Sequence, residues 1–68
     1  MADAVYKKIS IVGTSESSLS DAVRVAVAKA AETVKNMSWF EVEEQRGSIV
    51  DGKVQQFQVT LSIGFRVD

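Results

Sequence analysis

Residues 53–67 read KVQQFQVTLSIGFRV and have the cleanest alternation of apolar and polar side chains in the chain. Such alternation is typical of a β-strand with one buried face. The apolar set comprises Phe57, Val59, Leu61, Ile63, Phe65 and Val67, and the opposite set comprises Gln56, Gln58, Thr60, Ser62, Gly64 and Arg66. The dipeptide Asp51-Gly52 directly before this stretch indicates a two-residue hairpin turn. We therefore expect residues 39–50 to form the partner strand.

Two further elements precede the hairpin. Residues 5–12, VYKKISIV, are rich in β-branched side chains and predict a strand that ends at Gly13. A helix of about 18 residues is expected from Leu19, with Ser18 as its N-cap and Asp21 in the capping-box position. Apolar side chains recur along it at helical spacing, at Leu19, Ala22, Val23, Ala26, Val27, Ala30 and Val34.

This order of elements predicts an α+β fold, a β-α-β-β protomer in which a three-stranded antiparallel sheet packs on one helix. If strand 53–67 lies between the other two strands, every neighbouring pair is antiparallel. We expect the helix to cover the apolar face of residues 57–67, with Phe40 and Val42 beneath it. One helix about 10 Å wide cannot cover the whole sheet, so part of the sheet is expected to contact other copies of the chain.

The composition excludes several classes of function. The chain has 68 residues, a net charge of −1, no cysteine and no histidine. It therefore has no histidine general base, no thiol nucleophile, no disulfide and no ordinary zinc site. The near-neutral charge disfavours binding to nucleic acid. Because so short a chain builds a small core, we expect it to be stabilised by oligomerisation.

We expect a single domain over residues 1–68, located in the cytoplasm. No run of apolar residues approaches the length of about 18 that a membrane span requires. The N-terminal sequence MADAVYKK lacks the apolar segment of a signal peptide.

Trp39, the single tryptophan, is the most informative side chain. Its parity in strand 39–50 is opposite to that of Phe40, so it is expected to point away from the helix. Two interpretations stay open: an anchor at a subunit interface, or a stacking platform for a planar ligand. Counting back from the turn predicts the cross-strand pairs Val50–Lys53, Gln45–Gln58, Glu43–Thr60, Glu41–Ser62 and Trp39–Gly64. Gly64 either leaves open space beside the indole or marks a bend or bulge in its strand.

Three polar side chains are candidate ligand contacts. The amide of Gln58 offers the donor and acceptor that a pyrimidine or imide edge needs, unless it is simply a solvated strand residue. Arg46 and Arg66 could bind a phosphate through forked hydrogen bonds or pair with carboxylates. The neighbouring acids indicate a solvated or interface-pairing face more simply than an acid–base pair or a magnesium site; they are Glu41, Glu43 and Glu44.

Nearly the whole chain resembles the dodecins, small flavin-binding proteins. The stretches that carry the resemblance are the alanine-rich helix, YKKISIVGTSESS at residues 6–18, NMSWFEVEEQRG at residues 36–47 and FQVTLSIGFRV at residues 57–67. The resemblance implies a hollow homododecamer in which Trp39 stacks on the isoalloxazine ring of a paired flavin at a subunit interface. It also implies that Gln58 hydrogen-bonds the pyrimidine end of the ring. Arg46 and Arg66 match the arginines of the bacterial branch, where FMN is the expected ligand and riboflavin or FAD the alternatives. Some bacterial members also hold coenzyme A.

The function expected from the resemblance is storage and sequestration of flavin, with quenching of its photochemistry and without catalysis or a metal. In the predicted register Trp39 and Gln58 lie about six residues apart, roughly 20 Å, which is too far for one ring to touch both. Either a neighbouring subunit supplies Gln58, which we favour, or a bulge near Gly47 shifts the register. Two rivals stay open, a structural interaction module without flavin and a flavin-dependent enzyme.

Overall fold

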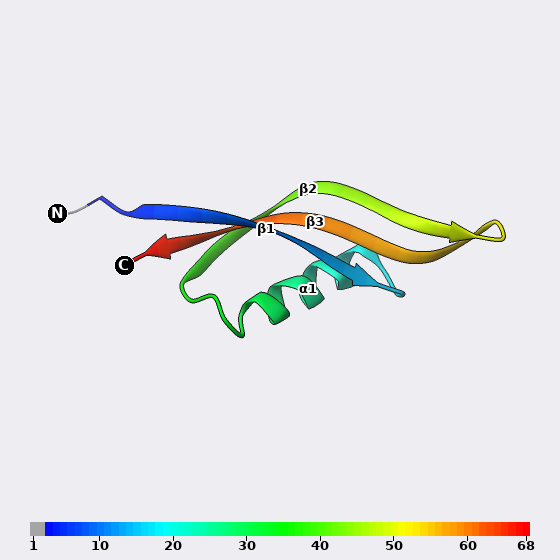
Figure 1. Cartoon of the computed structure of the whole chain (residues 1–68), viewed down its shortest axis with the longest axis horizontal. Helices are drawn as coiled ribbons and strands as arrows, with labels where there is room; N and C mark the ends of the chain where they lie inside the picture. The colour runs from blue at the N-terminus through cyan, green and yellow to red at the C-terminus, as the bar shows by residue number, and fades with distance from the viewer. Residues whose placement is uncertain (1–2) are drawn as a thin grey trace.

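The computed structural model describes residues 3–68, which form three β-strands and one α-helix (Figure 1). The elements in chain order are β1 (Val5–Ser15), α1 (Leu19–Ala30), β2 (Met37–Val50) and β3 (Lys53–Val67). β3 lies in the middle of the sheet and pairs antiparallel with both β1 and β2. This confirms the predicted α+β fold. Met1 and Ala2, which the predicted domain and the N-terminal sequence MADAVYKK include, lie outside the described residues.

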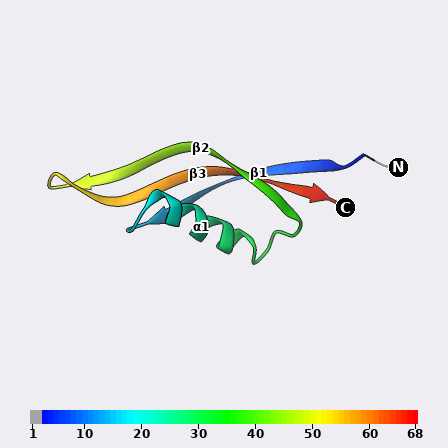
Figure 2. The ribbon, with the colours of Figure 1, turned by 180° about the vertical axis from the view of Figure 1, so that it is seen from behind.

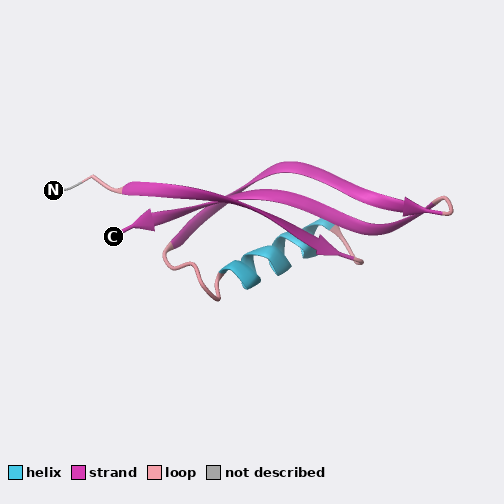
Figure 3. Ribbon diagram, viewed as in Figure 1, coloured by secondary structure: helices cyan, strands magenta, loops and turns pink. Residues whose placement is uncertain are grey.

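α1 lies against one face of the sheet, and the other face of the described chain carries no helix (Figures 2 and 3). Ala22 and Ala26 pack there against Val59 and Leu61 of β3 to form the core. The helix also lies close to β1, because a methyl group at Gly13 would overlap the carbonyl oxygen of Ala22 and come within 2.7 Å of the Cβ of Ala26. Small residues on both elements therefore let α1 pack directly on β1 and β3.

The N-terminus of α1 is capped as predicted, with one difference. The Ser18 hydroxyl accepts a hydrogen bond from the backbone N–H of Asp21 at 2.9 Å. The Asp21 carboxylate, however, accepts from the hydroxyl of Ser15 at 2.7 Å. The hydroxyl of Ser15 in turn accepts from the backbone N–H of Ser17 at 2.9 Å. The last residue of β1 thus ties the strand to the start of the helix.

The predicted length of the helix was wrong, because α1 has 12 residues and ends at Ala30. The next residues close a tighter turn, in which the N–H groups of Glu32 and Thr33 donate to the carbonyl groups three residues earlier, at 3.2 and 3.1 Å. β-Branched Thr33 and Val34 disfavour a longer helix, and Asn36 reverses the chain with a φ of 63°. α1 is too short to cross a membrane, and the described residues contain no helix that could do so.

The pairing of β2 with β3 has three irregularities, one of them between Met37 and Trp39, and the other two offset each other. The predicted pairs Val50–Lys53, Glu41–Ser62 and Trp39–Gly64 are confirmed. Between them the predicted pairs were wrong, because Gln58 lies opposite Arg46 rather than Gln45, and Thr60 lies opposite Glu44 rather than Glu43. The shift begins between Ser48 and Ile49 and ends between Val42 and Glu44. One unpaired residue on each strand thus moves the register by one and then restores it.

Phe40 and Val42 are not beneath the helix, contrary to the prediction. They pair with Ile63 and Leu61, yet they are 51% and 38% exposed because α1 packs over β1 and β3 and leaves β2 uncovered. The hairpin of β2 and β3 also extends beyond α1 (Figure 1). The radius of gyration is 14.3 Å, against about 11 Å for a compact chain of this length. The protomer is therefore elongated, with apolar side chains uncovered along β2.

Candidate functional site

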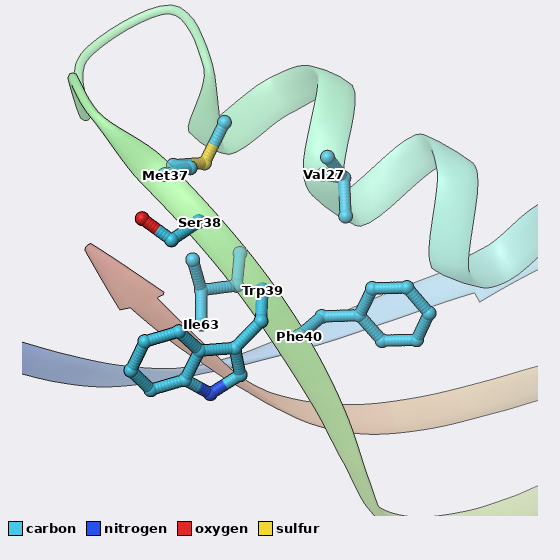
Figure 4. Close-up of a pocket in the computed structure, with 6 residues that line it drawn as sticks. All are labelled: Val27, Met37, Ser38, Trp39, Phe40 and Ile63. Atoms are coloured by element: carbon cyan, nitrogen blue, oxygen red, sulfur yellow. The ribbon is translucent and has the colours of Figure 1, made fainter.

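Trp39 lies on the face of the sheet that the helix leaves open, as predicted. In Figure 4 its indole and the ring of Phe40 project to opposite sides of β2. A methyl group at Gly64 would overlap three atoms of the six-membered ring of the indole. The indole therefore lies over the backbone of Gly64. The expected open space beside the ring is filled by the indole itself, and glycine is needed there because any side chain would displace the ring.

Tyr6 of β1 is the aromatic neighbour of Trp39. The centroids of the two rings are 5.0 Å apart and the ring planes are tilted by 56°. This arrangement lies in the range that aromatic pairs favour. The contact was not predicted, because the hairpin turn sets the register of β2 on β3 but not that of β1. The alternation of residues 5–12 already placed Tyr6 on one face, and the observed pairing of Tyr6 with Arg66 brings it to the site.

Arg66 lies at the same end of β3 as the indole. It is two residues beyond Gly64, so strand alternation places its side chain on the same face as Trp39. Its backbone N–H donates to the carbonyl oxygen of Asn36 at 3.0 Å, which fixes the start of β2 beside the end of β3. The side chain is exposed. Trp39 and Arg66 therefore form one half of the candidate site.

Gln58 and Arg46 form the other half. They are directly opposite each other on β3 and β2, a pairing that the shifted register creates. Gln58 is half-buried, and its amide nitrogen donates to the side-chain oxygen of Gln56 at 3.0 Å. Gln56 was not predicted as a site residue, although its spacing of two from Gln58 put both on one face. This contact orients the side-chain amide of Gln58.

The two halves are well separated within one protomer. Gln58 and Gly64, which lies under the indole, are about six residues apart on β3, or roughly 20 Å. The irregularity next to Gly47 exists, but it moves Gln58 opposite Arg46 and not toward Trp39. A single ring system cannot reach both Trp39 and Gln58 of the same protomer.

A polar strip connects the two halves. The buried hydroxyl of Ser62 donates to the carboxylate of Glu43 at 2.6 Å. Lys8 and Glu41 form an exposed ion pair at 3.7 Å. Exposed pairs of this kind contribute little to stability. These carboxylates have partners on the sheet, and residues 3–68 contain no cluster of three or more acids placed to hold a metal ion.

A hollow of about 230 Å³ lies on the helix side of β2 (Figure 4). Its walls are mostly apolar and come from α1, β2 and β3; the lining residues are Val27, Met37, Ser38, Trp39, Phe40 and Ile63. The indole itself faces away from this hollow. The hollow is the part of the sheet that α1 fails to cover, and its apolar walls suit packing against protein better than binding a polar ligand.

The fold and the site define a small α+β protein that presents one aromatic ring and several hydrogen-bonding side chains on an open sheet face. Comparison with known proteins shows what this class is: the model of the Dodecin family matches residues 5–68, and the chain belongs to that family. It is 47% identical to the Dodecin of Thermus thermophilus over 64 residues, which cover 94% of this chain and 93% of that protein.

Solved structures of relatives agree with the fold. The dodecin from Streptomyces coelicolor is 43% identical, with a TM-score of 0.94 over 100% of this chain and 97% of that one. The calcium dodecin from Mycobacterium tuberculosis is 32% identical, with a TM-score of 0.81 over 94% of this chain and 91% of that one. That second structure is described as having a novel calcium-binding site.

Proposed function

We propose that this protein binds flavin, with FMN as its principal ligand, and stores it without chemical conversion. The observation that carries the proposal is the placement of Trp39. One face of its indole rests on Gly64, and the side chain is still 42% exposed. A flat aromatic surface fixed on one side and open on the other suits stacking with a planar ring such as isoalloxazine.

The other candidate residues have matching chemistry. The amide of Gln58 can both donate to and accept from the pyrimidine end of a flavin. Arg46 and Arg66 offer forked donors for the phosphate of FMN. An electron-rich indole in contact with an excited flavin can donate an electron and receive it back, which returns the flavin to its ground state. The site would then protect as well as store the ligand.

We further propose that the site is completed by other copies of the chain, in a homododecamer. Two observations support this. Trp39 and Gln58 of one protomer lie roughly 20 Å apart, so both can contact one flavin if different subunits supply them. The uncovered apolar side chains of β2, with Phe40 51% and Ile49 71% exposed, are the kind of surface that a second subunit covers.

We favour binding over catalysis for two reasons. A stacked pair of flavins between two indoles leaves little room for a substrate. The carboxylates nearest the site already have partners in Ser62 and Lys8. Calcium, named for the Mycobacterium tuberculosis relative, is not proposed as a ligand, because the described residues do not gather acids for it.

Titration of FMN against the wild type and two variants tests the proposal. Trp39→Ala is expected to lower FMN affinity by about 5- to 100-fold, the effect of losing one stacked ring, and to weaken quenching of flavin fluorescence. Trp39→Phe keeps an aromatic surface and should lose less affinity. Arg24→Ala, a change at an exposed residue of α1, is the control. Unchanged titration curves for Trp39→Ala would refute the proposal.

The rival function, a structural interaction module, rests on the exposed apolar side chains of β2 alone. It predicts that Trp39 anchors a subunit contact and that the purified protein binds no FMN. Trp39→Ala would then change the oligomeric state and not ligand affinity.

A further inference from the structure

We propose that Tyr6 is a positioning residue, which holds the Trp39 indole in its flat orientation before any ligand arrives. The inference rests on the proposed flavin site and adds a residue to it. Tyr6 belongs to β1, so the stacking surface is built from all three strands: the indole from β2, the glycine beneath it from β3, and the ring beside it from β1.

The geometry explains why the indole needs a neighbour. Gly64 supports the ring from below, but a glycine has no side chain that could stop the indole from turning about its side-chain bonds. The Tyr6 ring stands beside it at a centroid distance of 5.0 Å and a tilt of 56°. A tilted ring at this distance occupies the space into which the indole would swing, and the edge-to-face component of the contact is attractive.

The position of Tyr6 is itself fixed by the sheet. It pairs with Arg66, and the next residue on the same face, Lys8, pairs with Gly64. Tyr6 is therefore diagonal to the glycine that carries the indole, at the spacing across which aromatic side chains reach each other. Side-chain alternation puts Tyr6 and Trp39 on the same open face, so the contact follows from the register of the two outer strands on β3.

The consequence is preorganisation. A mobile indole must lose its freedom when a ligand stacks on it, and that loss weakens binding. A ring already held in place avoids this cost. Removal of the Tyr6 ring should therefore loosen Trp39 in the ligand-free protein and reduce FMN affinity by about three- to tenfold. The phenol oxygen plays no part, so phenylalanine should replace tyrosine.

Time-resolved fluorescence anisotropy of ligand-free protein tests this inference directly, because Trp39 is the single tryptophan. Tyr6→Ala should add a fast decay component from local motion of the indole, on top of slow overall tumbling. Tyr6→Phe should restore the decay of the wild type. Val12→Ala is the control, since Val12 is 60% exposed on the same strand and shares the alternation of Tyr6. FMN titration of the same proteins should rank them in the same order.

A Tyr6→Ala protein with the anisotropy decay of the wild type overturns the inference, and so does a Tyr6→Phe protein that behaves like Tyr6→Ala. If Tyr6→Ala does not fold, Tyr6→Leu keeps apolar bulk on the strand without the ring and is expected to show the same fast component. The anisotropy measurement needs no ligand. A wild type that fails to bind FMN therefore defeats the proposed function, while the decay curves still decide the role of Tyr6.

Discussion

Trp39 and Gly64 lie opposite each other on β2 and β3, and the indole of Trp39 occupies the space that a side chain at Gly64 would need. This relationship makes the largest aromatic side chain of the protein a flat part of the sheet surface. It also leaves one face of the indole against protein and the other toward solvent. A planar ligand can therefore stack on one side of each Trp39.

Gly64→Ala should disable this surface. The added methyl group would overlap the six-membered ring, so the indole must lift or rotate away from the sheet. We expect FMN affinity to fall by about tenfold or more, as for loss of a stacking contact. Titration of FMN, followed by the quenching of its fluorescence, measures the affinity.

Gly52→Ala serves as the control for Gly64→Ala. Gly52 has nothing within 4 Å of an added methyl group, but its φ of 75° makes alanine unfavourable there. The control should lose some stability and keep FMN affinity. Equal FMN affinity in Gly64→Ala and the wild type would argue against a role for the flat indole.

Arg46 and Arg66 should discriminate between FMN and riboflavin. Their guanidinium groups can bind the phosphate of FMN, which riboflavin lacks. Arg46→Ala and Arg66→Ala are each expected to weaken FMN binding by about tenfold and to leave riboflavin binding nearly unchanged. Calorimetric titrations at two salt concentrations measure both effects, since phosphate contacts weaken with salt. Arg24→Ala, a change on α1, is the control. Parallel losses for both ligands would contradict a phosphate role.

The separation of Trp39 and Gln58 predicts that defective subunits complement each other. Trp39→Ala and Gln58→Ala should each impair FMN binding. If different subunits supply the two contacts, unfolding and refolding the two variants together should create some intact sites and restore part of the tight binding. The separately refolded variants, mixed afterwards without exchange of subunits, are the control. No recovery in the co-refolded sample would place both contacts in one subunit.

Gly13→Ala should lower stability without touching the flavin site. The methyl group would overlap the backbone of α1 at Ala22, so the helix must move off β1. Overpacking of this kind costs about 1–3 kcal/mol. The midpoint of urea unfolding should fall by the corresponding amount, while Thr14→Ala, an exposed neighbour on β1, should change it little. An unchanged midpoint for Gly13→Ala would mean that the close packing of α1 on β1 adds little to stability.

Local patterns were sufficient to predict most of the fold. The alternation of residues 53–67 and the Asp51-Gly52 turn fixed the central strand, and Ser18 fixed the start of the helix. The end of the helix was missed because apolar spacing continues to Val34, whereas the chain turns after Ala30. The burial of Phe40 and Val42 was missed because periodicity identifies the face of a strand, but not which part of that face a helix covers.

The arrangement of the candidate residues was predicted only in part. Parity placed Trp39 on the open face, and the turn placed it opposite Gly64. The pairing of Gln58 with Arg46 depends on two bulges that no turn or periodicity signal marks, because each needs a single unpaired residue. The contact of Tyr6 with Trp39 depends on the register of β1, which no hairpin sets.

Native mass spectrometry of the purified protein with added FMN is the sharpest test of flavin binding by an assembly, because it reports the number of subunits and of ligands in one spectrum. We predict a homododecamer that binds one FMN for each subunit, and a Trp39→Ala assembly of the same size that loses most of this ligand. A monomer that binds FMN by itself, or an assembly that binds none, would contradict this prediction.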